Sequence, residues 1–107
     1  MIAITLFSLK DKAIKEKYKK WTLDSVRPRM MMMNSVKAFV DYSVVGLLNH
    51  SGTEYDFIEI FEITNQKEFE DDNSKGLGLE LANEWNDWVD SYSIIFCEDI
   101  NLSLIHI

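Results

Sequence analysis

Four segments of the chain have the apolar content and the length of β-strands. They are Ile2–Leu9, Val36–Asn49, Tyr55–Asn65 and a last segment, Tyr92–Ile105. Successive side chains of a strand point to opposite faces, so a strand with one solvent-exposed face alternates apolar and polar residues. These segments are largely apolar in both sets of positions, the second segment least cleanly. The pattern therefore predicts a sheet that is covered on both faces.

The third segment shows this pattern most clearly. One of its faces carries Phe57, Glu59, Phe61 and Ile63, and the other carries Ile58, Ile60, Glu62 and Thr64. Both faces are mostly apolar, yet each contains one glutamate. We therefore expect one acid under the helices, and the other toward whatever covers the second face or at its rim.

The segment between the first two strands has the pattern of an amphipathic helix. Ser8 followed by Asp11 fits a capping box for a helix that starts near Leu9. Pro28 predicts a break just before it, although a short new turn can follow. The apolar residues at the helical spacing are Ile14, Tyr18, Trp21 and Val26.

A second helical region is predicted between the third and fourth strands. Asn65 followed by Glu68 fits a helix start, and the sequence NSKGLG interrupts the region. A further helix is then predicted, because large apolar residues recur at helical spacing. They are Leu81, Trp85, Trp88, Val89 and Tyr92.

The resulting order, β-α-β-β-α-β, is the ferredoxin-like order of an α+β protein. It gives one four-stranded antiparallel sheet with its helices on one face, in a single domain over residues 1–107. The other face of such a sheet is usually polar. Since it is apolar here, we expect a second copy to pack on it, sheet against sheet, as a symmetric homodimer.

Composition and charge limit the classes of partner and the cell compartment that we expect for this protein. The net charge is −7, so we expect no nucleic-acid partner, because phosphate binding needs a concentrated positive surface. The basic sequence KEKYKK is typical of the solvent-exposed face of an amphipathic helix. No apolar run approaches the length of a membrane span, and the first residues lack a signal-peptide pattern. With a single cysteine, Cys97, these features predict a soluble cytoplasmic protein.

Two segments resemble a known family. YDFIEIFEITNQKEFE and EWNDWVDSYSIIFCEDI, in this element order, resemble the dimeric α+β barrel superfamily, and within it the RedY-like (HapK-type) proteins of prodigiosin-type pigment pathways. The resemblance spans nearly the whole chain. It implies a homodimer of bacterial secondary metabolism with a cofactor-free pocket for pyrrole- or indole-type intermediates. Related barrels include cofactor-independent monooxygenases, cyclases and dehydratases, so the resemblance leaves the reaction open.

Glu59 is the first candidate for acid–base chemistry. A carboxyl group between two phenylalanines has a raised pKa, which suits a general acid or base near neutral pH. The alternative is a glutamate at a strand edge, or one that is paired with Arg27 or Arg29. Glu62 lies nearer the strand end, where water reaches it more easily.

The other catalytic candidates are His50, Tyr42 and Glu98. His50, in the turn after the second strand, would serve as a proton shuttle if that turn covers the pocket, and is otherwise an exposed residue. Tyr42 would orient a polar group of the substrate or pack in the core, and it faces away from its neighbour Asp41. Glu98 shares a face with the apolar residues of the last strand. His106 sits in a terminus that is usually frayed.

Aromatic residues and methionines are candidates for the walls of a pocket. A flat heteroaromatic would stack on them, although core packing explains them equally well. Four consecutive methionines cannot all lie on one face of an element. The candidates are Trp85, Trp88, Trp21, Phe61 and Met31.

Motifs for other chemistries are missing from the sequence. Its histidines and its cysteine show no metal-ligand spacing, and it has no GxGxxG or P-loop pattern, so we expect neither a metal nor a cofactor. Three functions stay open. They are a cofactor-free acid–base enzyme that performs a cyclisation, condensation or dehydration, a carrier that shields a hydrophobic intermediate, and a protein whose sheet binds another protein.

Overall fold

Four strands form one antiparallel sheet in the order β2-β3-β1-β4 in a computed structural model, which describes residues 1–101. Their bounds are β1 Ile2–Leu9, β2 Val36–Ser43, β3 Phe57–Ile63 and β4 Val89–Cys97. The helical elements are η1 Lys12–Ile14, α1 Lys15–Trp21, η2 Thr22–Val26, α2 Arg27–Met30, α3 Gln66–Asn73 and α4 Gly76–Asn86. This arrangement confirms the predicted α+β, ferredoxin-like fold.

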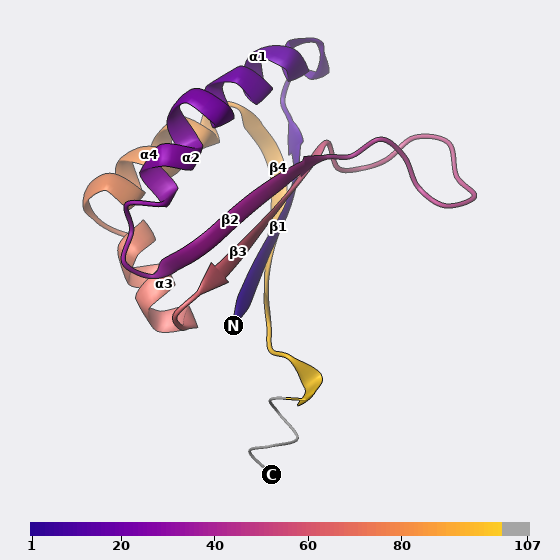
Figure 1. Cartoon of the computed structure of the whole chain (residues 1–107). Coiled ribbons are helices and arrows are strands. Elements are labelled where there is room, and N and C mark those ends of the chain that lie inside the picture. Colours follow the sequence, from indigo (N-terminus) through magenta and orange to yellow (C-terminus); the bar gives the residue numbers. More distant parts are fainter. Residues whose placement is uncertain (102–107) are drawn as a thin grey trace.

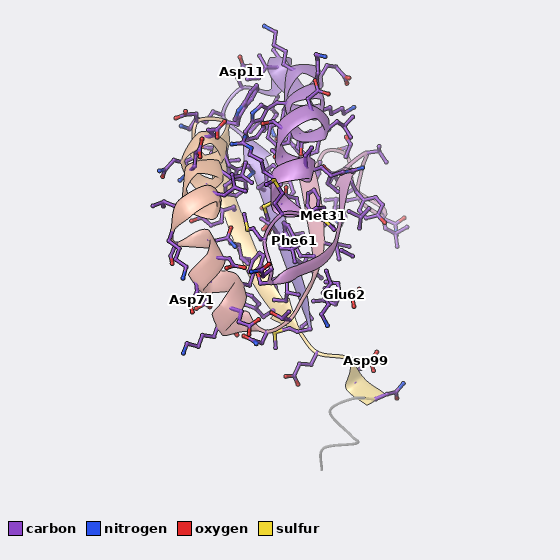
Figure 2. The ribbon with its side chains drawn as sticks, turned by 60° about the vertical axis from the view of Figure 1, so that its left-hand side comes forward. Asp11, Met31, Phe61, Glu62, Asp71 and Asp99 are labelled. Carbon is purple, nitrogen blue, oxygen red and sulfur yellow. The ribbon has the colours of Figure 1, made fainter. Side chains whose placement is uncertain are left out.

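The helices lie on one face of the sheet (Figure 1). The opposite face carries no helix within residues 1–101. Alternation along β3 places consecutive residues on the two sides: Phe61 is buried against the helices, whereas Glu62 is exposed (Figure 2). The prediction of one glutamate on each face is therefore confirmed.

Strand register divides the helix-covered face into three rows that run across the sheet from β2 to β4. The outer rows are rich in aromatic residues and the middle row is polar. The first row is Phe39, Phe61, Ala3 and Phe96, the middle row is Asp41, Glu59, Thr5 and Ile94, and the third row is Ser43, Phe57, Phe7 and Tyr92. The first row belongs to a hydrophobic cluster around Phe61 and Phe69, and Phe57 and Phe7 of the third row belong to a second cluster around Phe7 and Tyr18.

The uncovered face is apolar, as the sequence predicts. Its central row consists of aliphatic side chains from all four strands, in the order Val40, Ile60, Ile4 and Ile95. In the isolated chain, 47% of Ile95 and 38% of Val40 are exposed to solvent. Leaving an apolar face of this kind in water costs free energy, which burial against another surface would recover.

The first helical region differs from its prediction at both ends. Asp11, and not Ser8, caps the first turn, because its carboxylate accepts the Ala13 N–H at 2.9 Å. The hydroxyl of Ser8 is bonded instead to that of Ser91, at 2.8 Å. At the other end no break precedes Pro28: the π-helical turn η2 leads directly into the short helix α2. Pro28 stands in the first turn of α2, where its missing N–H costs no intrahelical hydrogen bond.

The second strand is shorter than predicted. It ends at Ser43, and residues 44–56 form a long connection to β3 that projects from the body (Figure 1). The expected antiparallel pairing of the second and third strands is present, with Asp41 opposite Glu59.

The prediction of a helix that runs through Trp88 to Tyr92 is wrong. Helix α4 ends at Asn86, and β4 starts at Val89, because this segment pairs with β1. A bulge near Ser8 and Leu9 adjusts the register there. The spacing of the apolar residues in this segment is compatible with a helix and with a strand. Pairing with β1 decides in favour of the strand.

Candidate functional site

A cavity of about 390 Å³ lies between the sheet and the helices. Its apolar and aromatic lining residues are Val26, Met30, Phe61, Phe69, Leu81, Ala82, Trp85, Tyr92, Ile94 and Phe96. Its polar lining residues are Thr5, Glu59, Glu70, Asn73, Ser74 and Asn86. The volume falls within the range of small-molecule sites, which are mostly apolar with a few polar groups.

Glu59 is the buried acid of this cavity. It lies in the middle row of the sheet and is only 6% exposed. Burial, and after it the nearby charge of Asp41, raises the pKa of its carboxyl group to about 8. The group is therefore largely protonated at neutral pH and can both donate and accept a proton there.

Asp41 is the neighbour that most directly influences Glu59. It sits opposite Glu59 on the adjacent strand, and its carboxylate forms an ion pair with Arg27. The Thr22 hydroxyl donates a hydrogen bond to the same carboxylate at 3.2 Å. These contacts fix the Asp41 carboxylate next to Glu59, where its charge contributes to the raised pKa of Glu59.

Tyr18 connects this acidic pair to the cavity wall. Its hydroxyl accepts a hydrogen bond from the Trp85 indole N–H at 3.1 Å, and it also hydrogen-bonds Thr22. Burial, followed by the nearby charge of Glu59, raises the pKa of Tyr18 far above its usual value. Tyr18 is therefore a neutral phenol that fixes the orientation of Trp85.

Arginine pairing with Glu59, the alternative reading of that residue, is not observed. Arg27 pairs with Asp41, and Arg29 pairs with Glu84 on α4. Both cations are thus engaged by other acids.

The structure brings together three of the predicted site residues: Glu59, Phe61 and Trp85. Trp21 and Trp88 do not line the cavity. Their rings stack on each other, with centroids 5.4 Å apart, in the cluster around Tyr18.

Met31 is misplaced in the prediction. It is 46% exposed, whereas the preceding residue, Met30, is buried and lines the cavity. One residue along a helix rotates the side chain by about a quarter turn, which is enough to move it from the core to the surface.

The remaining catalytic candidates lie away from the cavity. Tyr42 is on the uncovered face, because it is adjacent to the inward-facing Asp41. His50 is an exposed residue of the β2–β3 connection, which does not cover the cavity. Glu98 follows β4, is exposed and does not line the cavity. His106 lies outside the described residues.

Sequence reasoning missed several polar residues of the site, notably Asp41, Thr5 and Glu70. Alternation along β2 placed Asp41 opposite to Tyr42, but only the register between strands reveals that Asp41 and Glu59 share a row. Thr5 is flanked by apolar residues and reads as an ordinary strand residue.

Residues 1–101 show neither a cluster of metal ligands nor a membrane-spanning helix. In that part of the chain, no group of three or more His, Cys, Asp or Glu side chains is placed to hold a metal ion. None of its helices is long and apolar enough to span a bilayer.

Several solved structures share this fold at low sequence identity. HapK from Hahella chejuensis is 17% identical, with 92% of this chain and 93% of that chain covered and a TM-score of 0.73. A dimeric ferredoxin-like protein of unknown function from Thermobifida fusca is 12% identical, with coverages of 88% and 85% and a TM-score of 0.67. SnoaB, described as a cofactor-independent oxygenase from Streptomyces nogalater, is 7% identical, with coverages of 92% and 92% and a TM-score of 0.62.

Sequence comparison identifies a narrower family within this fold. No curated protein matches the chain. The family model described as REDY-like protein HapK matches residues 1–100. The chain therefore belongs to the REDY-like HapK family.

Proposed function

We propose that this protein is a cofactor-independent acid–base enzyme of bacterial secondary metabolism, in a pathway of the prodigiosin type, with a pyrrole- or indole-type intermediate as its substrate. One observation carries the proposal: a buried carboxyl group with a pKa of about 8, Glu59, lies in an aromatic-lined cavity. Family membership supports the metabolic setting. The fold shared with a described cofactor-independent oxygenase supports chemistry without a cofactor.

Glu59 supplies the proton transfers in this proposal. In its protonated form it donates to a carbonyl or hydroxyl oxygen of the substrate, which makes the carbon electrophilic or the hydroxyl a better leaving group. The resulting carboxylate then removes a proton from carbon or nitrogen, which restores the acid. A cyclisation, condensation or dehydration needs one such exchange.

The aromatic lining positions the substrate. The rings of Trp85 and Tyr92 contact each other edge to face, with centroids 5.1 Å apart, and Phe61 lies beside Glu59 in the neighbouring row of the sheet. A flat heteroaromatic ring stacks well on such surfaces. Tyr18 acts as a positioning residue, since it holds the Trp85 indole by a hydrogen bond.

The test compares two glutamates of one strand. Glu59→Gln should reduce turnover of pyrrole or indole carbonyl compounds by about a hundredfold or more, the usual contribution of a general acid–base group. Glu62→Gln removes a carboxyl group from the opposite face and should leave turnover unchanged. Product formation is followed by mass spectrometry, and equal activity of the Glu59→Gln variant would contradict the proposal.

A carrier is the second candidate, because most of the cavity-lining residues within 1–101 are apolar or aromatic, and among them Glu59 is the one buried acid. A carrier should bind its ligand equally well after Glu59→Gln and lose it after Trp85→Ala. Binding is measured by calorimetry. This pair of variants separates a catalyst, which needs Glu59, from a container, which needs the aromatic wall.

We propose in addition that the protein forms a homodimer through its uncovered sheet face. The central row of aliphatic residues on that face supports this association. The description of a protein with the same fold as dimeric supports it independently.

A further inference from the structure

The cavity contains acids and no cations. Among its lining residues within the described part of the chain, Glu59 and Glu70 are the ones with a carboxyl group, and no lysine, arginine or histidine is present. Glu59 is buried, whereas Glu70 is exposed. Any ligand therefore meets carboxyl groups at two depths.

The two nearest arginines along the chain are held elsewhere. Helix α2 contributes Met30 to the cavity, and Arg27 and Arg29 precede Met30 on the same helix. Arg27 pairs with Asp41, and its guanidinium lies 5.9 Å from the ring centroid of Phe39.

Arg29 is held by two partners. It donates two hydrogen bonds to the Glu84 carboxylate and one, at 2.6 Å, to the Ser25 hydroxyl. Neither arginine can turn into the cavity without leaving an acid unpaired, which is costly for partly buried ion pairs.

The neutral polar groups of the cavity are amides and hydroxyls. Asn73, Asn86 and Thr5 can hydrogen-bond the N–H and C=O groups of a ligand. They do not offer the charge-assisted hydrogen bonds that carboxylates and phosphates take from arginine or lysine. An anionic ligand would lose part of its hydration on entering the cavity, and no cationic side chain of the lining would compensate for that loss.

We propose that the cavity selects its ligand by charge. It takes aromatic N–H compounds that are neutral or positively charged, and it rejects the same rings when they carry a carboxylate or phosphate group. The inference rests on the proposed function, in that the ligand is a pyrrole- or indole-type ring.

The protonation of Glu59 supports this selection. Its pKa of about 8 keeps it neutral at pH 7, where a neutral ring can share its proton. Above pH 8 the carboxylate attracts a cation more strongly. A ligand amine with a pKa near 10, like that of lysine, still carries its charge there.

Three ligands with one ring system test the proposal: indole-3-acetamide, tryptamine and indole-3-acetate. Calorimetry on the full-length protein at pH 7 should show the neutral amide binding at least tenfold more tightly than the anionic acetate. Tryptamine should bind about tenfold more tightly at pH 9 than at pH 7, because Glu59 loses its proton over this interval.

Two variants assign the effect to the cavity. Glu59→Gln should abolish the pH dependence of tryptamine binding, and Glu62→Gln, on the opposite face, should retain it. If the acetate binds within threefold of the acetamide, the charge selection is wrong, while the proposed aromatic substrate class survives. If none of the three ligands binds, both the selection and the proposed function fall.

Discussion

At the scale of single residues, the environment of Glu59 is set by its row in the sheet. Phe57 and Phe61 flank it along β3, Asp41 and Thr5 flank it across the sheet, and helices cover it. Desolvation then favours the uncharged carboxyl group. The same residue type three positions later, Glu62, faces the opposite side and is exposed.

The raised pKa of Glu59 has a consequence for stability. An unfolded chain ionises this group above about pH 4.5, whereas the folded protein retains the proton until about pH 8. Between these values the folded state binds one proton more, so this residue lowers the free energy of unfolding by up to about 1.4 kcal/mol per pH unit. The loss stops above pH 8, where both states are ionised.

Glu59→Gln should remove this dependence. We expect its free energy of unfolding, measured by urea denaturation, to exceed that of the native sequence by a margin that grows from pH 5 to pH 8 and is constant above. Glu62→Gln is the control for losing one carboxyl group. Asp41→Asn removes the neighbouring negative charge and so lowers the pKa of Glu59. In that background, the margin between Glu59→Gln and Glu59 should level off at a lower pH. A margin independent of pH would show that Glu59 titrates normally.

At the scale of elements, Gly78 sets the contact between α3 and α4. These two helices supply one wall of the cavity, including Phe69, Leu81 and Trp85. A Cβ atom at Gly78 would lie 1.9 Å from the backbone oxygen of Asp72, at the end of α3. Only a glycine allows this approach, because backbone cannot move aside as a flexible side chain does.

Gly78→Ala should therefore lower the free energy of unfolding by about 1–3 kcal/mol, the usual cost of overpacking. It should also weaken ligand binding, since the helices must separate. Gly46→Ala is the matched control, because no atom lies within 4 Å of an added Cβ there. Thermal and urea unfolding measure both, and equal stability of the two variants would contradict the close contact.

At the scale of the whole molecule, the two faces of the sheet have different environments. Helices cover one face (Figure 1). The other face exposes its aliphatic row to solvent in a single chain. A contiguous exposed apolar face often marks a protein interface. The proposed homodimer would make each chain the cover of its partner.

Ile60→Glu should convert this dimer into a monomer. Ile60 belongs to the central row of the uncovered face, and an unpaired charge buried there costs several kcal/mol, or about a hundredfold or more in dimer affinity. Leu79→Glu, on an exposed site of α4, should leave the dimer intact. Sedimentation measures the mass of each variant. A native protein that sediments as a monomer would favour the reading in which the sheet binds another protein.

The sequence by itself determined the element types of all four strands, the order of the elements and the two faces of β3, because alternation and apolar content are local properties. It also singled out Glu59, Phe61 and Trp85, since an acid among aromatics is visible in the letters. Local signals were equally good at the start of α3, where the Asn65 side chain accepts the Glu68 N–H at 2.8 Å.

Tertiary structure decided what depends on partners far along the chain. Pairing with β1 made Val89–Cys97 a strand from its first residue, against a helical spacing that was just as regular. Register placed Asp41 beside Glu59, and packing sent Trp88 to Trp21 and away from the cavity. Such choices follow from contacts between segments, and no local pattern contains them.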